Sequence, residues 1–218
     1  MTRVRVDLNI SLDGFATTTD QTPNNPFGDD WGRLTADYVA TRTFRERVLH
    51  MADGSGTTGV DDRYAARYFE DLGAEIMGAA MFGLHLHGDD PGWRGWWGEE
   101  PPFRVPVLVL THAPRPPIHF ENGTRFEFLS ATPRDALARA KELASGGDVR
   151  IGGGPTTVRA FLREGLVDSL HVAMVPILLG RGEWLWQGLR GLEAGYRVES
   201  ETAPSGVTHL TFEREAAS

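Results

Sequence analysis

The chain has 218 residues, of which 40% are hydrophobic and 24% charged, as is usual for one globular domain. A net charge of −8 without any basic stripe argues against a nucleic-acid partner. Because there is no cysteine, disulfides, thiol nucleophiles and thiolate metal sites are excluded.

The N-terminal segment alternates in polarity. Every second residue from Val4 to Ile10 is apolar, which predicts a half-buried strand, and Asp13-Gly14 marks the turn after it. The segment lacks the apolar stretch of a signal peptide, and no run in the chain approaches the ~18 residues of a membrane span. We therefore expect a cytoplasmic protein without a membrane partner.

A long polar loop and two helices are predicted next. Residues 16–31 are rich in Pro, Gly and Asn and too long for a simple connection, as in functional lids. Apolar spacing predicts one helix over 34–51 and another over 61–72, where Asp61 or Asp62 is placed to cap the start. Gly73 is expected to stop the second helix.

Residues 83–104 form a turn-rich insertion. Its three tryptophans could make a partner or dimer surface, or fill the gap beneath the insertion: Trp93, Trp96 and Trp97. His85 and His87, followed by two aspartates, have some character of metal ligands. Because the segment is glycine-rich and no further ligand is evident, we expect no metal.

The remaining segments complete an α/β pattern. In order, we expect strands at 105–111 and 126–129, a helix at 133–144, a long apolar strand at 170–180, and a hairpin of 195–202 with 207–213. This alternation predicts a three-layer α/β/α domain with a mostly parallel mixed sheet and a C-terminal antiparallel hairpin. No repeat or linker interrupts the chain, so residues 1–218 are expected to form a single domain.

The most informative stretch is VRIGGGPTTVRAFLR, at 149–163. An apolar strand containing Ile151 meets Gly152, Gly153 and Gly154, and then Pro155 opens an amphipathic helix. The free N–H groups and the hydroxyls of Thr156 and Thr157 would form a site for an anion such as phosphate. The alternative is the tight strand-to-helix turn of any α/β protein.

Several such signals occur together in one order. Ser11-Leu12-Asp13-Gly14 ends the first strand, Gly78 follows a helix and strand, Thr111-His112 ends another strand, and the glycine segment lies within 148–182. In this order they resemble the dihydrofolate-reductase-like reductase domain of bacterial bifunctional deaminase-reductases of riboflavin biosynthesis, from residue 3 to about 213. No deaminase segment is present, so we expect a free-standing member.

The resemblance implies NADPH as the hydride donor. Its pyrophosphate would lie at Gly153, Gly154 and the helix that follows, and the Gly-Gly peptide there is expected to be cis. A second phosphate turn would be 78–81, in which Ala79 and Met81 replace the arginine and threonine of many members. That departure puts the affinity for the adenine-side phosphate in doubt.

The resemblance also places the two ends of the cofactor. Thr111 and His112 would contact the adenosine 2′-phosphate, with a protonated His112 or the nearby Arg115 supplying charge; a solvated turn histidine is the alternative. The nicotinamide would lie against four residues at the end of the first strand: Asn9, Ser11, Gly14 and Phe15.

Substrate would face the nicotinamide between Asp13, the loop ending at Trp31 and the second helix with Arg63. Asp13 is the candidate catalytic residue for fixing substrate or relaying a proton, although it could simply be a turn residue. Trp31 could stack on a flat heterocycle or pack beneath the loop.

These observations predict an NADPH-dependent reductase of a small heterocyclic or carbonyl substrate. The first candidate substrate is 5-amino-6-(5-phosphoribosylamino)uracil, although cationic residues for its phosphate are scarce near Asp13. Dihydrofolate-type reduction of another substrate, or a non-catalytic nucleotide-binding or interaction protein, are the alternatives. By resemblance, a homodimer is expected.

Overall fold

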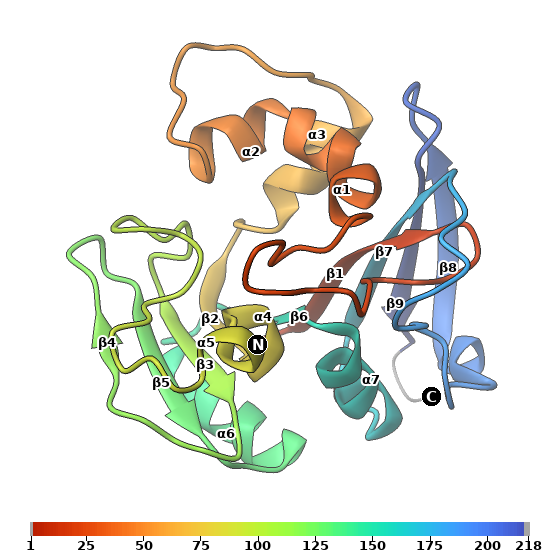
Figure 1. Cartoon of the computed structure of the whole chain (residues 1–218). Helices are drawn as coiled ribbons and strands as arrows, with labels where there is room; N and C mark the ends of the chain where they lie inside the picture. The colour runs from red at the N-terminus through yellow and green to blue at the C-terminus, as the bar shows by residue number, and fades with distance from the viewer. Residues whose placement is uncertain (1, 216–218) are drawn as a thin grey trace.

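The computed structural model describes residues 2–215, and within them one nine-stranded sheet forms the centre of the molecule, in the order β4-β5-β3-β2-β6-β1-β7-β9-β8 (Figure 1). The strands are β1 (Val4–Ser11), β2 (Leu72–Gly78), β3 (Pro106–Leu110), β4 (Ile118–His119), β5 (Arg125–Leu129), β6 (Asp148–Gly153), β7 (Ser169–Val175), β8 (Tyr196–Thr202) and β9 (Thr208–Arg214). The central strands from β5 to β7 pair in parallel, whereas β4, β9 and β8 are antiparallel to their neighbours. The predicted mixed sheet with a C-terminal antiparallel hairpin is confirmed.

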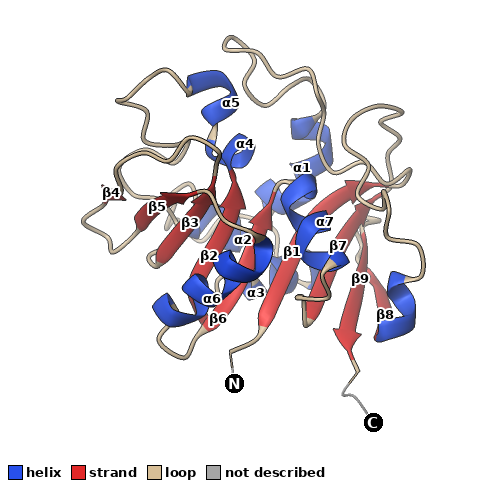
Figure 2. Cartoon of the chain, turned by 90° about the horizontal axis from the view of Figure 1, so that it is seen from below, coloured by secondary structure: helices blue, strands red, loops and turns tan. Residues whose placement is uncertain are grey.

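Helices cover both faces of this sheet (Figure 2). On one face lie α6 (Pro133–Leu143) and α7 (Pro155–Arg163). On the other lie α1 (Trp31–Ala40), α2 (Arg42–Arg47), α3 (Val60–Arg67), α4 (Ala79–Phe82) and α5 (Leu84–His87). A short 3₁₀ helix, η1 (Leu192–Gly195), leads into β8. None of the helices in this described part of the chain has the length and apolar character needed to span a membrane.

Strand alternation divides the core into two layers. Ile76 of β2 and Leu108 of β3 pack with the apolar stripes of α6 and α7. The next residues along the same strands, Met77 and Val109, point to the opposite face and pack with Phe82 of α4. This period of two is what the apolar runs of the sequence predict for a sheet buried on both faces.

The helix predicted over 34–51 is wrong, because the structure divides it at Thr41. The Thr41 hydroxyl accepts a hydrogen bond from the Phe44 N–H (3.2 Å) and donates one to the Tyr38 carbonyl (2.7 Å). Thr41 thus caps the start of α2 and ends α1 with an extended backbone.

The predicted cap of the second helix is also wrong. Gly59 occupies the N-cap position of α3 and neither aspartate caps it. Instead Asp62 accepts a hydrogen bond from the Thr43 N–H (2.8 Å), while Asp61 faces His209. Both carboxylates form tertiary contacts, which outweigh their local preference for the cap.

Two element ends differ most from the sequence prediction, those of the second helix and of the strand predicted over 170–180. The helix ends at Arg67, and Gly73 lies inside β2, at a position where a β-carbon would lie 2.3 Å from the Ala144 carbonyl oxygen. Strand β7 ends at Val175, directly before Pro176, which has no N–H for the ladder.

The insertion turns its tryptophans inward. The Trp93 indole donates to the Phe82 carbonyl (2.9 Å), and the Trp96 indole donates to the Met81 carbonyl (3.0 Å). Trp97 stacks near Phe126 of β5, with ring centroids 5.8 Å apart. The structure therefore shows the gap-filling alternative, in which the indoles also satisfy carbonyls at the end of α4.

Gly152 occupies a position where a side chain does not fit. The pairing of β2 with β6 shifts register beside it, and a β-carbon on Gly152 would lie 2.2 Å from Oε1 of Glu75. Glu75 is fully buried and bonded to Arg150, so it has little freedom to move.

We therefore expect Gly152→Ala to lower the free energy of unfolding by about 1–3 kcal/mol through this overpacking. Urea unfolding measures it. Gly195→Ala is the matched control, because the space around Gly195 is open, and it should change stability by less than about 0.5 kcal/mol. Equal effects of the two substitutions would contradict the proposed collision.

Candidate active site

Two glycine turns meet at the carboxyl edge of the parallel strands. A β-carbon on Gly78, at the end of β2, would lie 2.4 Å from the Thr157 hydroxyl, and one on Gly153 would lie 3.3 Å from the Met81 sulfur. The turns predicted separately at 78–81 and 152–157 are therefore adjacent. In open α/β sheets, ligands bind at this edge.

The N-terminus of α7 opens directly from this edge. The Gly153–Gly154 peptide is cis, as predicted, and Pro155 occupies the first turn of α7. The first helical hydrogen bond runs from the Val158 N–H to the Gly154 carbonyl (3.1 Å), so the N–H groups of Thr156 and Thr157 precede it. No heavy atom lies within 4 Å of a β-carbon built on Gly154, so the cradle is open.

One carboxylate stands near this helix start. Glu183 accepts a hydrogen bond from the Thr156 hydroxyl (3.3 Å) and pairs with Arg159 (2.9 Å). Because Arg159 also donates to Thr156 (2.9 Å), its positive charge offsets the carboxylate beside the helix N-terminus. An anion could therefore still bind there.

Thr111 and His112 follow β3 at the same sheet edge. The Thr111 N–H donates to the Leu129 carbonyl (3.0 Å), and its hydroxyl accepts from Ala113 (3.2 Å). His112 is exposed. Arg115 donates to the carbonyls of Asp90 and Pro91, so its guanidinium lies against the insertion.

The end of β1 is a tightly bonded turn. Ser11 is buried, and its hydroxyl accepts from the Phe15 N–H (3.0 Å). Gly14 has φ +90°, and a β-carbon there would lie 2.5 Å from the Trp184 indole nitrogen. Asn9 lies further back on β1, where its amide donates to the Leu34 carbonyl (3.4 Å).

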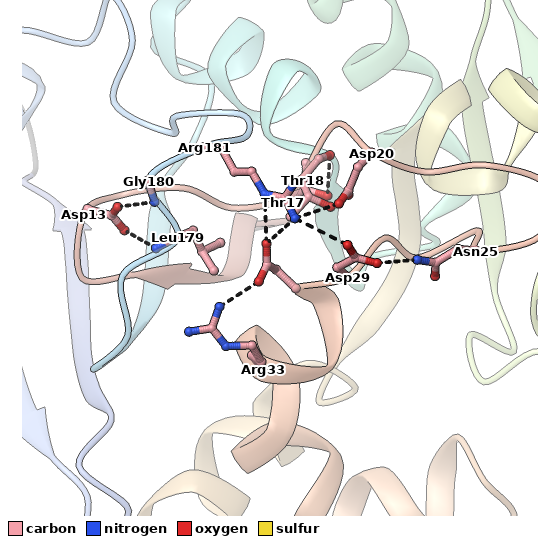
Figure 3. Close-up of polar contacts among 11 residues, drawn as sticks. Asp13, Thr17, Thr18, Asp20, Asn25, Asp29, Arg33, Leu179, Gly180 and Arg181 are labelled. Carbon is pink, nitrogen blue, oxygen red and sulfur yellow. Dashed lines mark hydrogen bonds and ion pairs between the residues drawn. The ribbon is translucent and has the colours of Figure 1, made fainter.

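Asp13 is bonded to the loop that follows β7 (Figure 3). Its carboxylate accepts from the Ser11 hydroxyl (2.5 Å), the Leu179 N–H (3.2 Å) and the Gly180 N–H (2.7 Å). Burial opposes ionisation, but these hydrogen bonds outweigh it and lower the pKa of Asp13. The carboxylate therefore holds two loops together, and its predicted catalytic role stays a prediction.

Arg181 joins the same loop to the long polar loop (Figure 3). Its guanidinium contacts Asp20 (2.8 Å), Asp30 (3.0 Å) and Asp29 (3.7 Å). Arg33 pairs with the other oxygen of Asp30 (2.7 Å), and these two arginines lower the pKa of Asp30. We call Arg181 and its three aspartates the loop clamp.

A row of buried charged side chains crosses the face of the sheet beneath α1 and α3. It consists of Glu75 of β2, Arg150 of β6, Asp7 of β1, His171 of β7 and His209 of β9. Arg150 donates to Glu75 (2.9 Å) and lies 3.5 Å from Asp7. These five residues, the polar row, were not predicted from the sequence; the available signal was a charged residue inside each apolar strand.

Burial and pairing act in opposite directions on these groups. Burial raises the pKa of Glu75, and the Arg150 charge reverses only part of this effect. Burial would likewise raise the pKa of Asp7, but His171, Arg150 and Arg5 outweigh it and lower it. One guanidinium thus holds two carboxylates of different proton affinity.

The two histidines link the row to α3. Nδ1 of His171 lies 3.3 Å from Asp7, Nε2 of His171 lies 2.9 Å from Nδ1 of His209, and Nε2 of His209 lies 2.9 Å from Asp61. Each contact is favourable when one proton lies in it.

Protonation of both rings would set two N–H groups against each other at the contact between the histidines. Consistent with this, burial lowers the pKa of His209 and the charge of His171 lowers it further, whereas Asp61 opposes the change. The ring of Tyr64 stacks on His209, with centroids 4.0 Å apart, and on His171 at 4.5 Å. The pair is therefore enclosed by α3.

A pocket lies between this pair and the end of β1. Its empty volume is about 310 Å³, which includes space that is open to solvent. We call it the β1–α3 pocket, and it is lined by Asn9, Leu34, Asp37, Tyr38, Asp61, Tyr64, Ala65, Tyr68, His171, Ala173, Val175, Val207 and His209. Of the residues predicted at the nicotinamide or substrate, only Asn9 lines it.

The other predicted substrate residues lie elsewhere. Arg63 pairs with Glu201 on the surface, and Trp31 is 37% exposed at the start of α1, with its ring 5.0 Å from Phe27. Phe27 also contacts Trp96, at 5.2 Å, so the long loop rests on the insertion. His87 of the insertion stacks on Trp93 at 3.8 Å, and residues 2–215 contain no group of side chains arranged to hold a metal ion.

The fold resembles that of dihydrofolate reductase. Dihydrofolate reductase from Enterococcus faecalis, solved as a complex with NADP(H) and RAB-propyl, has a TM-score of 0.51 at 12% identity, covering 98% of this chain and 97% of that one. A putative riboflavin biosynthesis protein from Shewanella sp. PV-4 has a TM-score of 0.61 at 22% identity, covering 99% and 100%.

The family is shown by sequence. The family model described as the RibD C-terminal domain matches residues 2–208, and the chain therefore belongs to this family. RibD from Acinetobacter baumannii has the same fold, with a TM-score of 0.52 at 18% identity, and this chain spans 59% of its length. No curated protein matches the chain. The predicted family and fold are confirmed, and membership supports a reductase of the riboflavin-biosynthesis type.

We expect Arg181→Gln to release the loop clamp without unfolding the protein. Because the Arg181 side chain is 51% exposed, solvent screens its ion pairs, and the unfolding free energy should change little. Hydrogen exchange of residues 17–30 should accelerate. Arg134→Gln, which breaks a separate surface pair with Glu164, should leave that exchange unchanged. Unchanged exchange in Arg181→Gln would show that the clamp does not order the loop.

The histidine pair predicts a pH dependence of stability. The unfolded chain protonates His209 near pH 6.5, whereas the folded protein does so only at lower pH. The unfolded state therefore binds the extra proton, and the free energy of unfolding falls as pH decreases through this window.

Urea unfolding at about pH 7.5 and about pH 5.5 tests this. His209→Gln should reduce the difference between the two values, whereas His119→Gln, at an exposed position, should retain it. The assignment to His209 fails if both variants behave like the natural sequence.

Proposed function

We propose that the protein is an NADPH-dependent reductase of a small heterocyclic or carbonyl substrate. The observation that carries the proposal is the adjacency of three features at one sheet edge: the Gly78 turn, the Gly153–Gly154 turn and the N-terminus of α7. Family membership supports the reductase class, and the fold is shared with a dihydrofolate reductase solved with NADP(H).

The residues present fit the cofactor. The cradle in front of Gly154 is open, and the N–H groups of Thr156 and Thr157 precede the first helical bond. His112 and Arg115 would bind the 2′-phosphate, since both lie just beyond β3 at the same edge. When bound, NADPH would supply the hydride.

The protein's own contribution would be to position the nicotinamide and the substrate and to enclose them away from water. The end of β1, fixed by the hydrogen bonds of Ser11 and Asp13, would present its backbone to the nicotinamide. The β1–α3 pocket begins at Asn9 on the same strand and would hold the substrate beside it. The 17–30 loop, attached through Arg181, would exclude water from this region.

One feature favours a second candidate function. Ala79 and Met81 offer no polar side chain in the turn after β2, which would weaken binding of a phosphate there. The alternative is a protein that binds a nucleotide on this fold without reducing a substrate. Dihydrofolate-type reduction and reduction of 5-amino-6-(5-phosphoribosylamino)uracil are the two specific reactions to compare against it.

Titration with NADPH and, separately, with NADH tests the proposal through tryptophan fluorescence and nicotinamide emission. We expect micromolar binding of NADPH and at least about tenfold weaker binding of NADH. Gly154→Val should weaken NADPH binding because its side chain fills the open cradle, whereas Gly195→Val, in open space at η1, should not. If neither NADPH nor NADH binds, the proposed reductase function is refuted.

Asp13 needs a separate variant because its carboxylate also holds residues 179–180. Asp13→Asn retains two acceptor lone pairs but loses the charge. Normal NADPH binding with loss of cofactor oxidation would support the predicted catalytic role. Retention of both would assign Asp13 to the loop contact alone.

A further inference from the structure

A buried arginine lies near the start of α7. Only 7% of the Arg159 side chain is exposed, and its guanidinium donates to the Trp184 carbonyl (2.6 Å) and to the Thr156 hydroxyl (2.9 Å). Within residues 2–215 its ionic partner is the Glu183 carboxylate, at 2.9 Å. Because an unpaired buried charge is costly, any group that takes the place of this carboxylate beside Arg159 must itself be an anion.

Glu183 occupies donors that a phosphate at this helix would use. Its carboxylate accepts from the Thr156 hydroxyl (3.3 Å) as well as from Arg159, and both donors belong to α7. The backbone N–H groups of Thr156 and Thr157 precede the first hydrogen bond of the same helix. Phosphate and carboxylate oxygens accept the same charge-assisted hydrogen bonds from a guanidinium. A bound phosphate and Glu183 would therefore compete for one set of donors.

The Glu183 side chain is free to leave Arg159 while its backbone stays in place. The Glu183 N–H donates to the Thr17 carbonyl (2.9 Å), and the Glu183 carbonyl accepts from the Ala16 N–H (3.0 Å). The side chain is 39% exposed, so a change of rotamer takes the carboxylate into water. Exposed side chains change rotamer within nanoseconds. Exchange of the ionic partner of Arg159 thus requires no rearrangement of the fold.

From this geometry we propose that Arg159 is a phosphate-binding residue of the cofactor site, and that Glu183 releases its guanidinium when the cofactor's pyrophosphate binds at α7. The inference rests on the proposed function, since it concerns the same cradle. Arg159 then supplies a cation for the pyrophosphate, which Ala79 and Met81 of the 78–81 turn do not. Glu183 has two effects of opposite sign: its pairing stabilises the fold, and it weakens phosphate binding.

The variant Glu183→Gln separates these two effects. The amide keeps the size of the side chain but loses its charge, so Arg159 lacks an ionic partner and the unfolding temperature should fall. Inorganic pyrophosphate, titrated calorimetrically into the full chain, should bind this variant about tenfold more tightly than the natural sequence. It should also raise the unfolding temperature of the variant by more. NADPH, followed by tryptophan fluorescence, should show the same gain in affinity.

Two further variants show whether the effect is specific to Arg159. Glu164→Gln is the matched control, because Glu164 pairs with Arg134 (3.0 Å) at the other end of α7 and its side chain is 33% exposed. It makes the same change in net charge but should leave pyrophosphate affinity unchanged. The double variant Arg159→Gln with Glu183→Gln removes both charges, so it buries no unpaired charge. It should bind pyrophosphate no more tightly than the natural sequence.

The possible outcomes separate this inference from the proposed function. Unchanged or weaker pyrophosphate binding in Glu183→Gln overturns the inference. An equal gain in the double variant also overturns it, because the gain would then come from removing a carboxylate and not from a contact with Arg159. If NADPH binds the natural sequence and Glu183→Gln equally well, the inference fails and the reductase stands. Tighter pyrophosphate binding in Glu183→Gln by a protein that does not bind NADPH would refute the reductase and leave the assignment of Arg159 standing.

Discussion

The buried guanidinium of Arg150 is the constraint on which the central sheet depends. It holds Glu75 of β2 and Asp7 of β1 from the strand between them, and the row continues through His171 to His209. A slip of one residue in any of these strands would turn a charged side chain into the apolar layer beneath α6 and α7, at a cost of several kcal/mol. The polar row therefore specifies strand register where apolar packing alone would accept alternatives.

The same row connects stability to the candidate substrate site. Tyr68 packs over Arg150, and Tyr64 stacks on the histidine pair, so α3 is positioned by the charged groups beneath it. The β1–α3 pocket lies where that stack meets Asn9. Removing one member of a buried ionic group leaves its partner uncompensated, typically at about 3–5 kcal/mol. The charged groups beneath the pocket therefore hold its floor in place.

The sequence predicts the features that arise from local interactions and misses those that arise from contacts between distant residues. Alternation from Val4 to Ile10 and the glycines before Pro155 are local signals, and they correctly predicted the place of β1 and of the strand-to-helix turn. The half-buried character predicted for β1 is wrong, because Arg5 and Asp7 on its second face are buried as well. The break at Thr41 was missed because a threonine is compatible both with the interior of a helix and with its N-cap position. Only the partners of the Thr41 hydroxyl distinguish the two. The pocket could not be predicted, since Asp37, His171 and His209 come together only through strand order and register.

This difference separates the two halves of the site. The proposed cofactor side consists of backbone N–H groups and glycine turns, whose geometry depends little on which side chains surround them. The proposed substrate side consists of carboxylate, imidazole and phenol groups carried mainly by four elements, α1, α3, β7 and β9, and each substitution there changes the charge or shape that a ligand meets. A protein can therefore keep the reaction class of its family while its pocket selects another substrate.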